Sequence, residues 1–306
     1  MIDWTNFSVS NNTLNFDCKR KNKEPHLTGL EAAFYNINYI TENYPAPYTL
    51  YLSGGVDSQA MLYAWVKSKV PFNTFSGIYN FDSNWNDLAT CNLFAKILDV
   101  KISYHHFDLI NFLETEHHDY AIKYKTGSPQ FTTFIKMAQM TEKGTVIFSG
   151  ECRPFFTFVR DDPPLAIPDL NSMGLYYYGS IDKRPIVPWF FIETETITYS
   201  WIYDHNITHK PVIDSFEVRQ QNKEMKLGYK RKIDIYHQND YPVIPQDNKQ
   251  NGFEKIKDYY DTQNKKPVTL QDRLAKGFFR SDRNFDLLFR NKYEAKLVKY
   301  KYNINW

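Results

Sequence analysis

The chain has 306 residues, of which 42% are hydrophobic and 24% are charged, so it is long enough for one large domain or two modest ones with a packed core. Its 37 basic and 35 acidic residues leave a formal net charge of +2, which does not by itself favour a nucleic-acid-binding protein. The three cysteines, Cys18, Cys91 and Cys152, are far apart, so we expect neither a disulfide framework nor a zinc site.

The first residues show no basic segment followed by an apolar one, and no stretch is apolar over the roughly 18 residues of a membrane span. We therefore expect no signal peptide and no membrane contact. Together with the widely spaced cysteines, this predicts a protein of a reducing compartment such as the cytoplasm.

Residues 1–45 predict an N-terminal arm followed by one helix. Residues 1–26 are polar with scattered aromatic side chains, which favours a short hairpin or an extended arm. Residues 28–43 carry apolar side chains at helical spacing, beginning at Thr28, a residue type that caps helices. Prolines at positions 45 and 47 end this helix.

Residues 46–160 alternate short apolar runs with segments of helical periodicity. Strands that alternate with helices of ten to fifteen residues predict an α/β core with a doubly wound parallel sheet. Such sheets bind ligands beyond the carboxyl ends of their strands. The expected strands are 48–52, 72–79, 101–109 and 145–150, and the expected helices begin near 58 and span 88–99, 112–124 and 131–140.

Residues 161–306 predict a mainly helical C-terminal part that completes the substrate site. Proline and aspartate are frequent in 153–169, where we expect no regular structure. An aromatic loop around 176–189 follows. The expected helices of this part lie near 192–203, 214–227 and 286–300.

Residues 53–58 read Ser-Gly-Gly-Val-Asp-Ser and join the first expected strand of the core to its helix. The backbone N–H groups of such a turn and of the helix N-terminus attract an anion such as phosphate or pyrophosphate. Gly54 and Gly55 let the backbone turn sharply and approach a ligand closely. Ser53 and Ser58 add hydroxyl donors.

Asp57 is the unusual member of this loop, because a carboxylate repels phosphate unless a cation lies between them. We therefore expect Asp57 to bind a metal ion. The alternative is an ordinary strand–helix turn, since glycine, serine and aspartate are common turn residues.

The sequence contains no Walker motif, G-x-x-x-x-G-K-[ST]. Residues 53–58 instead resemble SGGxDS, the pyrophosphate loop of the N-type ATP pyrophosphatases, or PP-loop superfamily. The resemblance implies an adenine nucleotide α-hydrolase-like fold that binds ATP and Mg²⁺. It also implies cleavage of ATP between its α- and β-phosphates, adenylation of an acceptor oxygen and release of pyrophosphate. In this reading, Ser53, Gly54, Gly55, Val56, Asp57 and Ser58 hold the nucleotide, and Asp57 holds the metal.

A weaker similarity, over residues 46–205, links the chain to asparagine synthetase and β-lactam synthetase domains. It implies that Ser128, Ser149 and Gly150 line the nucleotide site. It also implies a small-molecule acceptor with a carboxylate or amide, from which a nitrogen nucleophile displaces AMP. The matching residues are Asp87, His105, His106, Ser128, Pro129, Gln130, Ser149, Gly150, Glu151, Arg184 and Pro188.

The chain departs from these families after Glu151, where Cys-Arg-Pro-Phe replaces Gly-Ala-Asp-Glu. No acid therefore matches a metal ligand of that motif. We expect Glu151 and Arg153 to act beside Asp57. Glu151, or Asp161 and Asp162 in its place, would replace the missing metal ligand. Arg153 would instead neutralise the pyrophosphate, because a metal ion and a guanidinium both stabilise developing phosphate charge. The alternative is a nucleotide-binding protein without turnover. We expect no glutaminase domain, so ammonia is free or comes from a partner.

Some residue patterns allow further interpretations. The pairs His105-His106 and His117-His118 suggest a metal site, although adjacent residues on a strand point to opposite faces. Cys152 suggests a sulfur carrier in a tRNA-thiolating enzyme; the alternative is that it is simply a small buried residue. The Lys- and Tyr-rich residues 290–306 resemble a surface that binds nucleic acid; the alternative is a helix whose charged face is solvated. We thus expect tRNA as the less favoured partner. Asp82 and Asp87 either cap turns or contact ligand.

Overall fold

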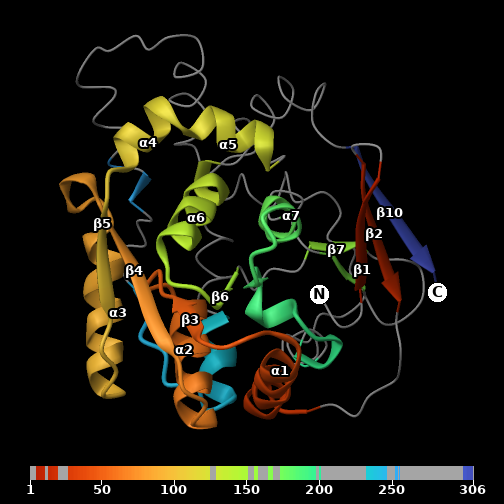
Figure 1. Ribbon diagram of the computed structural model, residues 1–306. Helices are drawn as coiled ribbons and strands as arrows, with labels where there is room; N and C mark the ends of the chain where they lie inside the picture. Colours follow the sequence, from red (N-terminus) through yellow and green to blue (C-terminus); the bar gives the residue numbers. More distant parts are fainter. Residues whose placement is uncertain are drawn as a thin grey trace, which may run out of the picture.

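A five-stranded parallel sheet forms the centre of the protein (Figure 1). The computed structural model describes residues 5–10, 13–19, 27–124, 129–150, 155–157, 165–167, 173–197, 200, 232–246, 252–253, 255 and 299–305. The strand order is β5-β4-β3-β6-β9, and every neighbouring pair is parallel. The strands are β3 (Tyr48–Tyr51), β4 (Asn73–Tyr79), β5 (Ser103–Phe107), β6 (Thr145–Phe148) and β9 (Ile186–Val187).

Helices cover both faces of this sheet, as expected for a doubly wound fold. One layer contains α1 (Gly29–Asn43), α2 (Val56–Ser68), α3 (Trp85–Ile97) and the helical residues 232–238. The other layer contains α4 (Leu109–Thr115), α5 (His117–Lys123), α6 (Pro129–Met140) and α7 (Met173–Ile181).

Apart from Thr49 and Thr145, the residues of the neighbouring strands β3 and β6 are apolar, because both faces of these strands are buried. Leu50 and Ile147 face the layer of α1 and α2, whereas Tyr51, Val146 and Phe148 face the layer of α4 and α6. This alternation is what the period-two geometry of a strand requires. The expected parallel α/β sheet is therefore confirmed.

Two smaller sheets complete the described strands. The hairpin of β1 (Thr5–Ser10) and β2 (Thr13–Lys19) confirms the expected N-terminal hairpin, and β10 (Lys299–Asn305) pairs with β2 in parallel. The expected helix 286–300 is wrong at its described end, because residues 299 and 300 belong to β10. Tyrosine, tyrosine and isoleucine at 300, 302 and 304 alternate with polar residues, which is strand periodicity.

Residues 153–169 also differ from expectation, because β7 (Phe155–Thr157) and β8 (Leu165–Ile167) pair antiparallel. The aspartates and prolines that suggested irregular structure fall outside the two strands, at positions 154, 161–164, 168 and 169. Both strands consist largely of apolar residues, including aromatic and β-branched ones, which favour strands.

Further differences concern short elements. The expected helix 112–124 is broken at Glu116 into α4 and α5. The expected aromatic loop around 176–189 instead contains most of α7 and strand β9, so the sheet gains its fifth strand beyond residue 160. A 3₁₀ turn at Phe190–Ile192 precedes the helical residues 195–197 and 200, which agree with the expected helix 192–203. The expected helix 214–227 lies outside the described residues.

Two isoleucines test the packing of the sheet. Ile147 is fully buried in the central strand β6, whereas Ile97 at the end of α3 is 63% exposed. We expect Ile147→Ala to lower the free energy of unfolding by about 2–5 kcal/mol, because it leaves a cavity in the core. The same substitution at Ile97 should change it by no more than about 0.5 kcal/mol. Urea denaturation of both variants measures the difference, and equal effects would contradict the described packing.

Candidate functional site: the loop between β3 and α2

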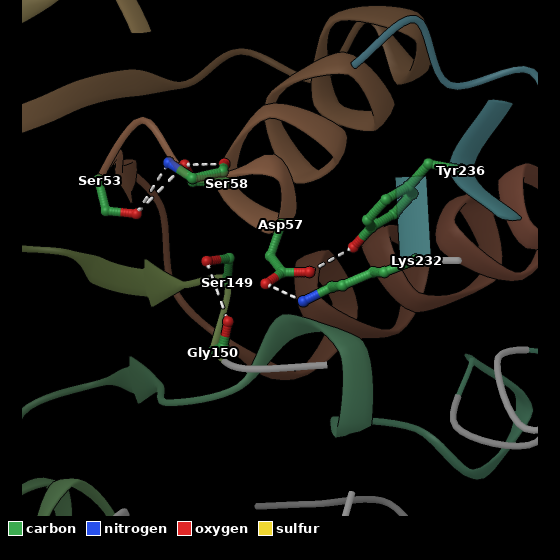
Figure 2. A network of polar contacts seen from close by, with 8 residues as sticks. Ser53, Asp57, Ser58, Ser149, Gly150, Lys232 and Tyr236 are labelled. Atoms are coloured by element: carbon green, nitrogen blue, oxygen red, sulfur yellow. Dashed lines mark hydrogen bonds and ion pairs between the residues drawn. The ribbon is translucent and has the colours of Figure 1, made fainter. Parts of the chain in front are cut away.

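The loop between β3 and α2 brings backbone amides and two serine hydroxyls together (Figure 2). The Gly55 N–H donates to Ser53 Oγ over 3.4 Å, and the Gly54 N–H donates to Ser58 Oγ over 3.1 Å. Ser58 Oγ in turn donates to the Gly55 carbonyl at 2.8 Å. Because the loop leads into the N-terminus of α2, these donors lie where the helix dipole favours negative charge.

Gly54 is the position at which this loop requires glycine. Its φ is +87°, a left-handed conformation that side chains rarely adopt, and a Cβ there would lie 1.9 Å from the Asp87 carbonyl oxygen. Asp87 belongs to the first turn of α3, so α3 packs directly against the loop. Gly55 is different, because its φ is −62° and a Cβ would meet only Ser53 Oγ, at 3.5 Å.

Asp57, in the first turn of α2, is 8% exposed and bonded through both carboxylate oxygens (Figure 2). Lys232 Nζ lies 2.5 Å from Oδ2, and the Tyr236 hydroxyl donates to Oδ1 over 2.7 Å. Residues 232 and 236 are one helical turn apart, so they reach the carboxylate from one face of the helical residues 232–238. This ion pair links residues far apart in the sequence.

Mg²⁺ bound to a nucleotide is usually held by one or two carboxylates in addition to phosphate oxygens. Asp57 is the carboxylate of this loop, and its charge is balanced here by Lys232. In the part of the chain that the structure describes, no three histidine, cysteine, aspartate or glutamate side chains form a metal-binding group. The role of Asp57 as a metal ligand therefore stays a prediction.

Burial keeps one cysteine thiol and two tyrosine hydroxyls behind the loop protonated. It raises the pKa of the Cys91 thiol to about 12, and the neighbouring Asp87 charge adds to this. Burial likewise raises the pKa of Tyr79 to about 12 and that of Tyr51 well above its usual range, and their hydroxyls lie 3.1 Å apart. These groups are neutral at physiological pH, so they add no charge beside Asp57 and Lys232.

The other predicted site residues are only partly brought to this loop. Ser149 and Gly150 follow β6, whose Phe148 pairs with Tyr51 of β3, so they lie beside the loop (Figure 2). Val56 is 3% exposed and packs into the core, so only its backbone faces the site. Ser128, Glu151 and Arg153 lie outside the described residues, as do the alternative candidates Cys152, Asp161 and Asp162.

His105, His117 and Arg184 have structural partners. His105 stacks on Phe75 with ring centroids 4.5 Å apart, and His117 Nδ1 lies 2.7 Å from Thr132 Oγ1. Arg184 Nη2 donates to Thr141 Oγ1 over 2.8 Å and thereby joins the residues before β9 to the end of α6.

Sequence reasoning missed Lys232 and Tyr236. Their contact with Asp57 spans more than 170 residues, and the local sequence there, Lys-Arg-Lys followed by an Ile- and Tyr-containing helix, resembles many solvated helices. The i, i+4 spacing of a lysine and a tyrosine was the sole signal, and it is common.

Among the described residues, no helix is both long enough and apolar enough to cross a membrane.

No family model and no curated protein matches this sequence. Among solved structures, the chain is similar to the U34-tRNA thiolase NcsA from Methanococcus maripaludis with its [4Fe-4S] cluster. The sequence identity is 12% and the TM-score is 0.33, over 86% of this chain and 78% of that chain. This likeness assigns no family, and we infer function from the site itself.

The two loop glycines make a matched pair of variants. We expect Gly54→Ala to lower the free energy of unfolding by more than about 2 kcal/mol, because the new Cβ meets the Asp87 carbonyl and φ is left-handed. Gly55→Ala should change it by less than about 1 kcal/mol, since alanine readily adopts φ of −62°. Chemical denaturation compares them, and equal stabilities would contradict the loop geometry.

Cys91 provides a second test of the site. It is 3% exposed and its raised pKa leaves almost no thiolate at pH 8, so we expect iodoacetamide to leave it unmodified in the native protein. In 6 M guanidinium chloride it should react completely. Peptide mass spectrometry reads this cysteine separately from the other two. Rapid native alkylation would show that the α3–loop contact is open.

Proposed function

We propose that this protein binds ATP at residues 53–58 and cleaves it between the α- and β-phosphates. The observation that supports this most is the convergence of the Gly55 N–H and the Ser53 and Ser58 hydroxyls at the N-terminus of α2. Such donors suit the oxygens of a pyrophosphate group. The resemblance of residues 53–58 to the PP-loop sequence agrees with this assignment.

The reaction transfers an adenylyl group. An oxygen of the acceptor attacks the α-phosphorus, the bond from this phosphorus to the bridging oxygen breaks, and pyrophosphate leaves with the electron pair. A nucleophile then displaces AMP from the activated acceptor. Mg²⁺ bound with the nucleotide supplies further neutralisation of the phosphate charge.

Lys232 provides the cation that this site needs. Asp57 and Tyr236 hold its helix at the loop, and its side chain is 14% exposed. An ammonium group in such a shielded position stabilises charge that develops on the leaving pyrophosphate more strongly than it would in water. Catalysis on this proposal is positioning plus electrostatic stabilisation, without a general base on the loop.

The acceptor separates two versions of this function that share the adenylating step. The asparagine-synthetase-like residue pattern favours a small carboxylate or amide. The Lys- and Tyr-rich residues 290–306 resemble a surface that binds nucleic acid, so tRNA belongs among the acceptors to test. Thiolation would need a reactive sulfur carrier. The buried, protonated Cys91 is unsuited to that role, and Cys152, the cysteine that suggested it, lies outside the described residues.

The test is the fate of α-³²P-labelled ATP with Mg²⁺, in the presence of a metabolite extract or of bulk tRNA. We expect labelled AMP and equimolar pyrophosphate with one of the two acceptors. Lys232→Met should lower the rate about 100-fold or more, as removal of a transition-state donor does. Asp57→Asn should lower it as well, because Lys232 then loses the carboxylate that holds it at the loop. Lys136→Met is the matched control, because it breaks a Lys136–Glu116 pair of the same 2.5 Å length away from the loop.

The alternative outcomes are distinct. Labelled ADP would overturn cleavage between the α- and β-phosphates. ATP that binds but stays intact with both acceptors would favour the nucleotide-binding protein without turnover. A protein that binds neither ATP nor pyrophosphate would overturn the assignment of the loop.

A further inference from the structure

The carbonyl oxygen of Gly54 accepts two side-chain amides from different parts of the chain. Gln59 of α2 donates its Nε2–H over 2.9 Å, and Gln246 donates its Nε2–H over 3.2 Å. Both side chains are buried, at 2% and 9% exposure. A loop carbonyl therefore holds two buried donors, one of which is 192 residues distant in sequence.

Gln59 also ties residues 241–246 to the loop. Its Oε1 accepts the Ile244 N–H over 2.7 Å, and its Nε2–H also lies 3.1 Å from the Ile244 carbonyl oxygen. The side-chain amide thus pairs with a backbone residue much as a neighbouring strand would. Residues 232–246 consequently contact the loop at two places, at the Asp57 carboxylate and at the Gly54 carbonyl.

The Gly54 carbonyl and the Gly55 N–H belong to one planar trans peptide, in which they point in opposite directions. The Gly55 N–H points to Ser53 Oγ, on the side where the hydroxyls converge. Donors that hold the carbonyl on one side therefore direct the N–H to the other side. Two glycines flank this peptide, so no Cβ opposes its rotation, and a rotated peptide would present a carbonyl oxygen to the anion.

We propose that Gln246, together with Gln59, is a positioning residue that orients the Gly54–Gly55 peptide so that its N–H faces the bound pyrophosphate. This rests on the proposed function, because it assigns pyrophosphate to the loop. Gln246 does not contact the ligand itself. The affinity of the loop for pyrophosphate thereby depends on a residue far beyond the core strands.

The decisive variants are Gln246→Met, which keeps the length of the side chain and removes the donor, and Gln246→Glu, which places an acceptor opposite the carbonyl. Asn239→Leu is the matched control. Asn239 accepts the Gly29 N–H over 2.9 Å and donates to the Ile235 carbonyl over 3.0 Å, so it ties the same segment to α1 rather than to the loop.

Isothermal titration calorimetry with inorganic pyrophosphate, ATP and adenosine separates the effects, all with Mg²⁺. We expect both Gln246 variants to weaken pyrophosphate and ATP binding roughly tenfold or more, as loss of a hydrogen bond to a charged group does. Adenosine binding should stay within about twofold of the wild type. Asn239→Leu should leave pyrophosphate binding unchanged, even where it lowers the thermal midpoint as much as Gln246→Met.

A spectroscopic readout reports the peptide directly. The chain has 12 glycines, so ¹⁵N-glycine labelling gives a simple amide spectrum, and the Gly55→Ala variant identifies the Gly55 signal. Pyrophosphate should shift this signal in the wild type and in Asn239→Leu, and should shift it much less in Gln246→Met.

Three results would count against the proposal. Pyrophosphate binding by Gln246→Met at wild-type strength, or equal losses for pyrophosphate and adenosine, would overturn the positioning role and leave the proposed function standing. A wild-type protein that binds neither pyrophosphate nor ATP would overturn both.

Discussion

The ion pair between Asp57 and Lys232 is the contact on which the arrangement of the loop depends. Two charges that are largely removed from water must be paired, since an uncompensated buried charge costs several kcal/mol, on the order of 3–5. The first turn of α2 and the helical residues 232–238 are therefore held together. Tyr236, fully buried, adds a second hydrogen bond to the same carboxylate. The loop is accordingly built from two distant parts of the chain.

The sequence predicted the sheet and the loop because their signals are local. Strands buried on both faces are mostly apolar, and residues 48–52 and 145–148 each contain a single polar residue, a threonine. A Gly-Gly pair between such a strand and a helix predicts a sharp turn, and Gly54 indeed has the positive φ that glycine permits. Chemistry confined to a few consecutive residues can be recognised without an alignment.

The remaining features depend on long-range packing. Lys232 is one of 37 basic residues, and nothing near it in the sequence indicates that Asp57 is its partner. Gln246 is an ordinary polar residue until the fold places it on the Gly54 carbonyl. Strand β9 has two residues, which is too short for a periodicity, and it exists because Val146 and Ile147 of β6 provide an edge for it.

The parallel pairing of β10 with β2 has a consequence for how the chain is made. The five strands of the central sheet have all been synthesised by residue 187, but the edge of β2 receives its partner only when residues 299–305 emerge. At about 5–20 residues per second, the 280 residues between Lys19 and Lys299 take roughly 15–60 s to synthesise. During that interval the nascent hairpin presents an unpaired edge, which is a template for association with other chains.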